Sequence, residues 1–366
     1  MSVFTNIDVQ NIAEISELSG ICFNPATLNY IEEGSTDSCF SLKDYDHKKY
    51  FLKIHENQKT SPHSVNRDLR LMVEFAEYLS CSNEKNSYLE ILAPYKWKDG
   101  KVYGYLNGLS NTYTKGKIMS IWPFVNPNHP MPIRNTQKYP LCMIERFGKA
   151  TAELHNLSLG YVPKKIITFP KDIFDTARTI KKIKKNENAI IRIDEAINKK
   201  DNHIISNSEV FLKILNDKVD YYSNEWCKRK LNEILEMGYI HGELKPTNTL
   251  ISIDKKVIFI DICKAGLGPL TLELGMAAQH FSDIDTVNIK GIECFIESYL
   301  SVRRDFIMRE LKYIPLMIKV SALRLAAYRA FAVSKGLENQ KSILTPLNIC
   351  LEMEELEDDL KASLTS

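Results

Sequence analysis

Four prolines within ten residues separate two stretches of the chain that follow different patterns. These are Pro123, Pro127, Pro130 and Pro132. Proline fixes φ and removes a backbone donor, so neither a helix nor a sheet strand continues through such a segment. Short β-like runs precede it, and apolar residues with helical spacing follow it. Since 366 residues also suit about two domains, the sequence predicts two lobes, residues 1–122 and residues 123–366.

The stretch before the prolines predicts a small lobe rich in β-structure. An apolar residue at every third position predicts a short amphipathic helix from Val9 to Leu18. A strand that begins at Cys39 pairs, across the polar turn at residues 44–49, with a strand at residues 50–54. The other predicted elements are a strand at residues 30–31, a helix at 68–79, strands on both sides of the Asp99-Gly100 turn, and a strand at 118–125.

The stretch after the prolines predicts a larger, mostly helical lobe. Apolar residues between Ile144 and Leu154 recur with helical spacing. A second helix is predicted at residues 223–237, with Gly238 as its C-terminal cap, and a third at residues 321–334. Taken together, the two stretches predict the α+β fold class.

The charge balance argues against a nucleic-acid or lipid partner. The chain has 48 Lys and Arg against 46 Asp and Glu, a formal net charge of +2, so no overall field draws it to a polyanion. Its eight cysteines are scattered, which is typical of a reducing compartment. The start lacks the apolar core of a signal peptide, and no apolar run is long enough to cross a bilayer. We therefore expect a cytoplasmic protein of undetermined oligomeric state, whose function comes from a site.

The residues most informative about chemistry lie between Tyr239 and Asp261, around two short β-runs at residues 249–253 and 257–260. This stretch carries two carboxylates, an ammonium group and an amide, namely Glu243, Asp261, Lys245 and Asn248. Phosphoryl transfer needs such groups: oxygen donors for Mg²⁺, a base near the acceptor hydroxyl and a cation near the γ-phosphate. The alternative is that Asn248 and Asp261 only cap turns.

The spacing of these residues resembles a known catalytic motif. Residues 241–248, HGELKPTN, resemble the HxDxxxxN loop of the aminoglycoside phosphotransferase/choline kinase superfamily and the HRDLKPEN loop of protein kinases. Asp261, in IDI, resembles the metal-binding DFG or DxD strand end. Within the superfamily the chain is most similar to type II homoserine kinases, in MSVFTNID, DLRLMVEFAEYL and SALRLAAYRAF. The resemblance implies a bilobal, protein-kinase-like fold with a small β-rich N-lobe and a larger, mostly helical C-lobe.

The resemblance implies a role for each residue that matches the motif. Glu243 takes the position of the catalytic carboxylate, and Lys245 takes that of the lysine at the γ-phosphate. Asn248 and Asp261 take the positions of the magnesium ligands, so ATP and Mg²⁺ are the expected cofactors. Lys53, in the predicted strand FLKI, matches the lysine that binds the α- and β-phosphates, a task that suits a point charge.

The resemblance also implies further contacts to the nucleotide from the N-lobe. The acidic partner of Lys53 is expected on the following helix, as either Asp68 or Glu74. Backbone amides of the turn EEGSTDS match the loop that covers the phosphates, and an ordinary hairpin turn fits that sequence equally well. The hinge is expected to bind adenine through its backbone. The residues concerned are Gly34 and Ser35 in the turn, and Phe124 and Val125 in the hinge.

The expected acceptor is a hydroxyl group on a small metabolite, with a homoserine-like amino acid as the first choice. Arg324 is the candidate partner of its carboxylate, the alternative being an ion pair between helices. Arg329, five residues further on, points about 140° away around the predicted helix and does not share that role. The sequence shows neither the acidic surface of an aminoglycoside site nor the aromatic cage of a choline site. An aminoglycoside or an amino alcohol is nevertheless an alternative acceptor.

Glu243 is the main departure from the family pattern, which has aspartate at this position. The extra methylene extends the carboxylate by about 1.5 Å, and a base must lie within hydrogen-bond distance of the proton that it takes. The alternative function is therefore a catalytically impaired nucleotide-binding relative, a pseudokinase or regulator. A protein kinase is disfavoured because no activation segment is recognisable in the sequence.

Overall fold

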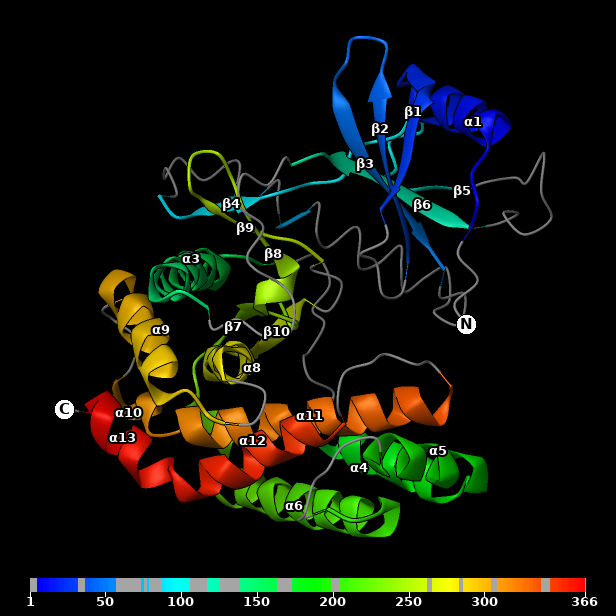
Figure 1. Cartoon of the computed structure of the whole chain (residues 1–366). Coiled ribbons are helices and arrows are strands. Elements are labelled where there is room, and N and C mark those ends of the chain that lie inside the picture. The colour runs from blue at the N-terminus through cyan, green and yellow to red at the C-terminus, as the bar shows by residue number, and fades with distance from the viewer. Residues whose placement is uncertain are drawn as a thin grey trace. The chain divides into compact units, whose positions relative to one another are not determined.

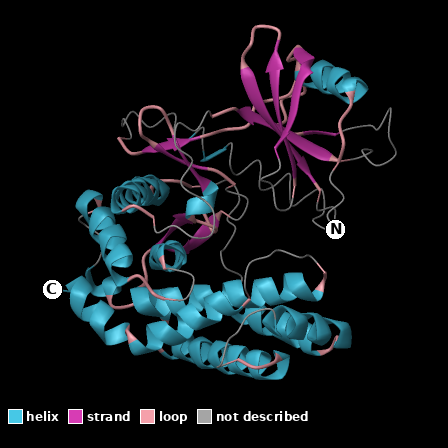
Figure 2. Cartoon of the chain, viewed as in Figure 1, coloured by secondary structure: helices cyan, strands magenta, loops and turns pink. Residues whose placement is uncertain are grey.

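The computed structural model describes residues 5–31, 37–56, 74–75, 78, 87–105, 117–125, 139–162, 173–198, 205–261, 265–282, 286–303, 308–336 and 343–365. The chain forms two compact units, which Figure 1 shows with their elements labelled. The first comprises Met1–Lys85 and Glu90–Asn128, and the second comprises Asn86–Leu89 and His129–Ser366. The first is built on a β-sheet and the second is mostly helical (Figure 2). The predicted α+β class, with a small β-rich part before a larger helical one, is confirmed.

An antiparallel five-stranded sheet of order β1-β2-β3-β6-β5 forms the first unit. Its strands are β1 (Phe23–Ile31), β2 (Ser38–Asp44), β3 (Lys49–His55), β5 (Gly104–Tyr105) and β6 (Ile118–Pro123). The predicted hairpin corresponds to β2 and β3, in which Cys39 lies opposite Lys53. On its other side, Lys53 lies opposite Ser120 of β6. Lys53 is therefore on a central strand, with a neighbour on each side.

The helix α1 (Val9–Ser19) begins with a capping box. The Asp8 side chain accepts the N–H of Asn11 at 2.9 Å, and the Asn11 side chain accepts the N–H of Asp8 at 3.2 Å. The helix ends at Gly20, which has a φ of 79°. Ile12 and Ile15 are buried and join the core of the sheet. That core also contains Phe23, Phe40, Leu42, Tyr50, Leu52, Ile54, Met119 and Ile121.

The second unit is built around α11 (Ile314–Ser334), a helix that is apolar and buried on most sides. It packs against α4 (Ile173–Lys184), α8 (Leu270–Ala278) and α12 (Leu344–Glu355) (Figure 1). Gly275 permits the close approach of α8, since a Cβ there would lie 2.4 Å from the Cβ of Met317. The remaining helices are α3 (Leu141–Leu159), α5 (Glu187–Asn198), α6 (Ser208–Lys228), α7 (Leu231–Ile234), η2 (Gln279–Phe281), α9 (Ile289–Val302), α10 (Met308–Leu311) and α13 (Glu357–Thr365).

Two small sheets carry the segment with the candidate catalytic residues. Their strands are β4 (Leu89–Ile91), β7 (Met237–Ile240), β8 (Thr249–Ile251), β9 (Val257–Phe259) and β10 (Gly266–Pro269). β7 pairs with β10, and β9 lies between β4 and β8. The antiparallel β8–β9 hairpin confirms the two β-runs predicted there. Residues 241–248 therefore connect β7 to β8, and Asp261 follows β9.

One predicted helix was wrong. Instead of a helix at residues 223–237 that ends at Gly238, the chain has α6, a left-handed Lys230 with a φ of 51°, the short α7 and then β7. Gly238 lies inside β7 and is needed for packing: a Cβ there would lie 2.5 Å from Cδ2 of Leu270 and 2.9 Å from Oγ of Ser158. The glycine reflects a close approach between elements rather than a helix cap.

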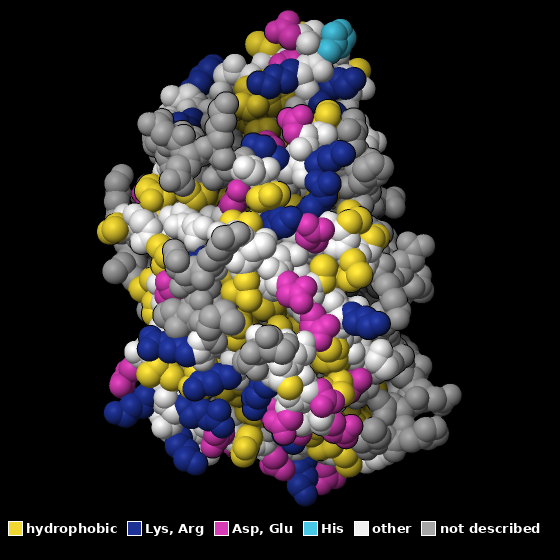
Figure 3. All heavy atoms as spheres, turned by 90° about the vertical axis from the view of Figure 1, so that its left-hand side faces the viewer, with side chains coloured by type: hydrophobic (Ala, Val, Ile, Leu, Met, Phe, Trp, Pro, Cys, Tyr) yellow, Lys and Arg dark blue, Asp and Glu magenta, His cyan; other side chains and the backbone are white. Residues whose placement is uncertain are grey.

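The surface fits the near-zero net charge. On the face shown in Figure 3, Lys and Arg side chains are interspersed with Asp and Glu side chains rather than gathered into one large field. Within the described ranges, no helix is both long and apolar enough to span a bilayer.

Candidate active site

The predicted catalytic residues Glu243 and Lys245 lie on the loop from β7 to β8. Gly242 has a φ of 78°, in the left-handed region that glycine adopts most readily. A 3-10 turn at Pro246–Asn248 returns the chain to β8. Nζ of Lys245 lies 2.7 Å from Oε1 of Glu243, and about a quarter of each side chain is exposed (24% and 26%). The loop thus presents a carboxylate and an ammonium group side by side at the surface.

His241 fixes this loop to the end of β9. Burial lowers the pKa of its imidazole, so the neutral ring has one donor nitrogen and one acceptor nitrogen. Nε2 donates to the carbonyl of Ile260 at 3.1 Å, and Nδ1 accepts the N–H of Glu243 at 3.3 Å. One buried side chain therefore holds the backbone of Glu243 and the residue before Asp261.

The backbone brings Asn248 and Asp261 together. The N–H of Ile260 donates to the carbonyl of Asn248 at 2.9 Å, and Asp261 directly follows Ile260 in the chain. This bond therefore holds the backbone of Asp261 near that of Asn248. The Asn248 amide nitrogen donates to the carbonyl of Glu243 at 3.1 Å, which leaves its amide oxygen as the atom that can ligate a cation. Asp261 has a φ of 64°, a conformation that costs energy in a residue other than glycine.

An amide oxygen and a carboxylate are the kinds of ligand that a hard cation such as Mg²⁺ prefers. Among the described residues, no group of three or more His, Cys, Asp or Glu side chains could hold a metal ion. Mg²⁺ in nucleotide sites commonly has one or two protein ligands and completes its coordination with phosphate oxygens and water, so two such residues would fit it.

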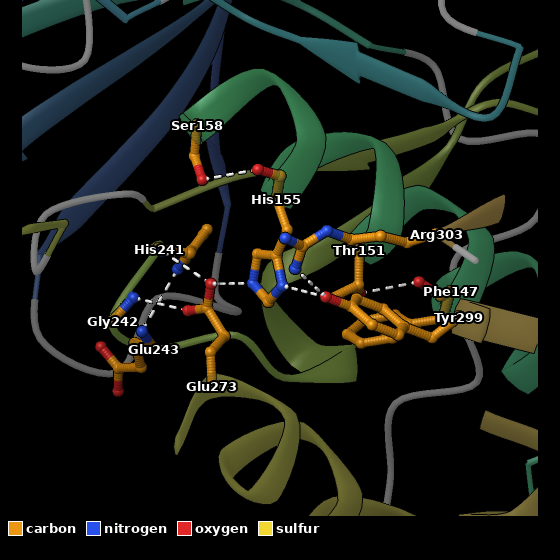
Figure 4. Close-up of polar contacts among 10 residues, drawn as sticks. All are labelled: Phe147, Thr151, His155, Ser158, His241, Gly242, Glu243, Glu273, Tyr299 and Arg303. Atoms are coloured by element: carbon orange, nitrogen blue, oxygen red, sulfur yellow. Dashed lines mark hydrogen bonds and ion pairs between the residues drawn. The ribbon is translucent and has the colours of Figure 1, made fainter. Parts of the chain in front are cut away.

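A buried carboxylate that the sequence did not assign holds the start of the loop (Figure 4). The two oxygens of Glu273, on α8, accept the N–H of His241 at 2.9 Å and the N–H of Gly242 at 2.8 Å. Nε2 of His155, on α3, lies 3.1 Å from the same carboxylate. The signal in the sequence is an acid inside the mostly apolar stretch LTLELG. Burying a carboxylate is costly unless it is hydrogen-bonded, so an acid in such a stretch indicates specific partners.

The Glu273 carboxylate is also one end of a chain of hydrogen bonds through three further side chains (Figure 4). Burial lowers the pKa of His155, so its neutral ring donates to Glu273 from Nε2 and accepts the O–H of Tyr299 at Nδ1, 2.9 Å away. The Tyr299 oxygen in turn accepts from Nη1 of Arg303 at 2.8 Å. Nη2 of Arg303 donates to Glu236 at 2.6 Å. Helices α3, α8 and α9 thereby share one buried polar network with the loop from β7 to β8.

In the first unit, Lys53 has a partner that the sequence did not indicate. Its Nζ lies 3.1 Å from Oδ2 of Asp37, the residue just before β2. Of the two predicted partners, Asp68 lies outside the described residues, and the half-buried Glu74 stays a prediction. The β2–β3 register explains the contact, because it continues from Ser38 opposite Ile54 toward Asp37.

The other predicted nucleotide contacts fall on two segments of the first unit. Gly34 and Ser35 lie outside the described residues. Phe124 and Val125 directly follow β6, and Nζ of Lys49 lies 3.7 Å from the centroid of the Phe124 ring, a cation–π contact. The backbone of this predicted hinge therefore begins where the pairing of β6 with β3 ends.

The predicted substrate residue Arg324 lies on α11 and is half-buried. Its Nη1 lies 3.7 Å from Sδ of Met276 on α8. Arg329 is further along the same helix, where burial lowers its pKa to about 10. The structure thus places Arg324 against the C-terminal half of α8, whose first half carries Glu273.

The family model described as "Phosphotransferase enzyme family" matches residues 27–291 of this chain. None of the curated proteins matches it. Among solved structures, amicoumacin kinase hAmiN in complex with AMP-PNP, Ca²⁺ and Ami is 12% identical, with a TM-score of 0.62 over 96% of this chain and 94% of that one. Choline kinase from Cryptosporidium parvum Iowa II is 14% identical, with a TM-score of 0.61 over 96% and 97%. An aminoglycoside phosphotransferase from Alicyclobacillus acidocaldarius is 13% identical, with a TM-score of 0.59 over 98% and 96%. At these identities the likeness shows a shared fold.

Proposed function

Because the chain belongs to the phosphotransferase enzyme family, we propose that it transfers the γ-phosphate of Mg-ATP to a hydroxyl group of a small metabolite. The predicted superfamily, aminoglycoside phosphotransferase/choline kinase, is confirmed. The predicted enzyme class, a small-molecule phosphotransferase that acts on an alcohol group, is confirmed as well. The metal ion, the role of each residue and the identity of the acceptor are proposals.

The observation that carries the proposal is the convergence of three functional groups on one loop and one strand end. The backbone bond from Ile260 to Asn248 joins the segments that carry Asn248 and Asp261, and His241 joins the backbone of Glu243 to the same strand end. Mg²⁺, when bound, would neutralise charge on the β- and γ-phosphates. We assign Asn248 and Asp261 as its protein ligands.

In the proposed reaction, Glu243 accepts or orients the proton of the acceptor hydroxyl, and Lys245 stabilises the charge of the transferred phosphoryl group. Their present separation of 2.7 Å supports this pairing, because it brings a carboxylate and an ammonium group to one point of the loop. The bonds from Glu273 to the loop backbone hold the start of this segment in place. The longer side chain of Glu243 thus extends from an anchored backbone.

We assign nucleotide binding to the lobe at residues 1–122 and catalysis to the lobe at residues 123–366. Lys53 is the proposed partner of the α- and β-phosphates, since it is a point charge on a central strand. The remaining proposed nucleotide contacts are Gly34, Ser35, Asp68 or Glu74, Phe124 and Val125. The cysteines Cys22, Cys142, Cys227, Cys294 and Cys350 are in the thiol form, which fits the reducing conditions of the cytoplasm, where we expect the enzyme to work.

We propose two classes of acceptor. A homoserine-like amino acid requires a cation for its carboxylate, and Arg324 is the proposed one. An amino alcohol or an aminoglycoside is supported instead by solved structures of similar fold, which are described as choline, ethanolamine and aminoglycoside kinases. Both classes carry a hydroxyl group and an amine or quaternary ammonium group, so an assay must compare them directly.

The test is incubation of the protein with Mg-ATP and homoserine, choline, ethanolamine or spectinomycin, with product masses measured directly. We expect a gain of one phosphoryl group on one acceptor class. Glu243→Gln should slow the reaction at least about 100-fold, the usual contribution of a positioned base, with Mg-ATP binding retained. Glu145→Gln is the matched control, because Glu145 is an exposed carboxylate paired with Lys149 on α3.

The phosphorylation assay and a calorimetric measurement of ATP binding together distinguish the rival functions. Mg-ATP binding without phosphorylation of any acceptor would support the alternative of a catalytically impaired relative. Absence of magnesium-dependent nucleotide binding by calorimetry would contradict the proposal as a whole.

A further inference from the structure

The two oxygens of the Asp37 carboxylate have different partners. Oδ1 accepts the backbone N–H of Glu56 at 3.1 Å, just beyond the end of β3. Oδ2 lies 3.1 Å from Nζ of Lys53, on the same strand. One oxygen is thus bound to the backbone, while the other faces the lysine ammonium.

The backbone partner of Asp37 is itself held firmly. The Glu56 carboxylate forms an ion pair with Lys117 and accepts the N–H of Thr5 at 2.7 Å. These contacts are mostly buried, and hydrogen bonds to Lys117 and Ser38 lower the pKa of Glu56 in spite of its burial. The Asp37 carboxylate is therefore held at the end of β3 by a contact that is separate from its contact with Lys53.

The contact between Asp37 and Lys53 is also shielded from water. Only 14% of the Asp37 side chain and 18% of the Lys53 side chain are exposed. Nδ1 of His55 lies 3.7 Å from the same Oδ2. An ion pair in such a setting is screened less than a surface pair, so it can fix the position of a long side chain.

We propose that Asp37 is a positioning residue for nucleotide binding, which holds the ammonium of Lys53 where it meets the phosphates. The inference rests on the proposed function, in which Lys53 binds the α- and β-phosphates. Lysine carries its charge on a flexible four-carbon stem, and immobilising such a side chain costs up to about 2 kcal/mol of rotamer entropy. A fixed carboxylate restricts the side chain of Lys53 before the nucleotide binds, so less rotamer entropy is lost on binding.

The test is Asp37→Asn, which keeps the shape of the side chain. Its amide oxygen can still accept the N–H of Glu56, whereas an NH₂ group replaces the oxygen that faces Lys53. We expect KM for Mg-ATP to rise about tenfold, which corresponds to about 1.4 kcal/mol, with a smaller change in kcat. Asp37→Glu should restore part of the affinity.

Asp44→Asn is the matched control in the same hairpin. One Asp44 oxygen accepts the N–H of Lys48 at 2.8 Å and the other accepts the O–H of Tyr50 at 2.8 Å, so the substitution makes the same chemical change away from Lys53. We expect KM for Mg-ATP to change less than twofold. A rise equal to that of Asp37→Asn, or no rise in Asp37→Asn, would overturn the inference.

A second measurement does not depend on turnover. Labelling of the nucleotide-free protein with an amine-reactive reagent near pH 8, followed by peptide mass spectrometry, reports how much of Lys53 is neutral and accessible. We expect Lys53 to react faster in Asp37→Asn than in the wild type, because the neighbouring negative charge is gone. Equal rates would refute the positioning role even if the protein proved not to bind ATP, whereas faster labelling in a protein without ATP binding would refute only the proposed function.

Discussion

At the scale of single residues, the candidate site depends on side chains that each satisfy two backbone groups. His241 bonds the Glu243 N–H and the Ile260 carbonyl, and Glu273 bonds the N–H groups of His241 and Gly242. Loops carry unpaired backbone groups that must find partners when they are buried. These bonds supply the partners and, at the same time, set the positions of Glu243 and Asp261.

Asp261→Asn tests the metal assignment at this scale. Asparagine has the same size as aspartate and tolerates the left-handed backbone, so the φ of 64° can be kept. Loss of the carboxylate charge should abolish phosphoryl transfer and reduce magnesium-dependent binding of ATP, while the melting temperature changes little. Calorimetric titrations with ATP in magnesium and in EDTA measure the effect. Unchanged magnesium dependence in the variant would show that Asp261 is not a ligand.

The motif residues were predictable because they are close together in the sequence, and their partners were not. Glu243, Asn248 and Asp261 stand at spacings that resemble a catalytic motif, and the structure shows the backbone bond that joins the last two segments. Glu273 bonds a residue 32 positions away, and Asp37 meets Lys53 across two strands. Such contacts follow from register and helix packing, which local patterns do not contain.

At the scale of elements, three helices contribute to one buried network that contacts the loop from β7 to β8. His155 comes from α3, Glu273 from α8 and Tyr299 from α9 (Figure 4). Each group is at or near zero exposure, so none of them can exchange its partner for bulk water. In a medium of low dielectric, an unpaired polar group is costly, which makes the network sensitive to the loss of a single atom.

Tyr299→Phe removes one oxygen from this network and keeps the ring. Nδ1 of His155 and Nη1 of Arg303 would each lose the partner described here, at a cost of about 1–3 kcal/mol in the free energy of unfolding. We also expect a lower kcat with little change in KM for ATP, because the network ends on the loop that carries Glu243. Urea unfolding and steady-state kinetics measure the two effects.

Tyr222→Phe is the control for that substitution. The Tyr222 O–H also donates to a carboxylate, that of Glu354, but 28% of the Glu354 side chain is exposed, so water can replace the lost partner. The control should lose less stability than Tyr299→Phe and keep its kcat. A kcat for Tyr299→Phe equal to that of the control would mean that the network supports the fold without affecting the loop.

The elements themselves were predictable to different degrees. The β2–β3 and β8–β9 hairpins follow from short alternating runs around polar turns, and both were predicted. The helix at residues 223–237 was wrong because Gly238 was interpreted as a cap, whereas its role is to let β7 approach Leu270 and Ser158. A glycine in a sequence does not distinguish a turn from a close contact.

At the scale of the whole molecule, each unit has its own core, and the balance of charge is almost neutral. We therefore expect the pH dependence of stability to come mainly from buried titratable groups rather than from repulsion between like charges on the surface. His155 and His241 are both fully buried in the second unit, and burial lowers the pKa of each. Both are neutral in the folded protein at pH values where an unfolded histidine begins to take up a proton.

This difference predicts that the second unit loses stability as the pH falls below the unfolded histidine pKa of about 6.5. The unfolded state then binds more protons than the folded state, and the free energy of unfolding falls by up to about 1.4 kcal/mol per pH unit for each histidine. Urea unfolding between pH 8 and pH 5 measures the slope. His241→Asn should reduce that slope by about one proton, since one buried histidine is removed. An unchanged slope in His241→Asn would contradict the assignment to buried histidines.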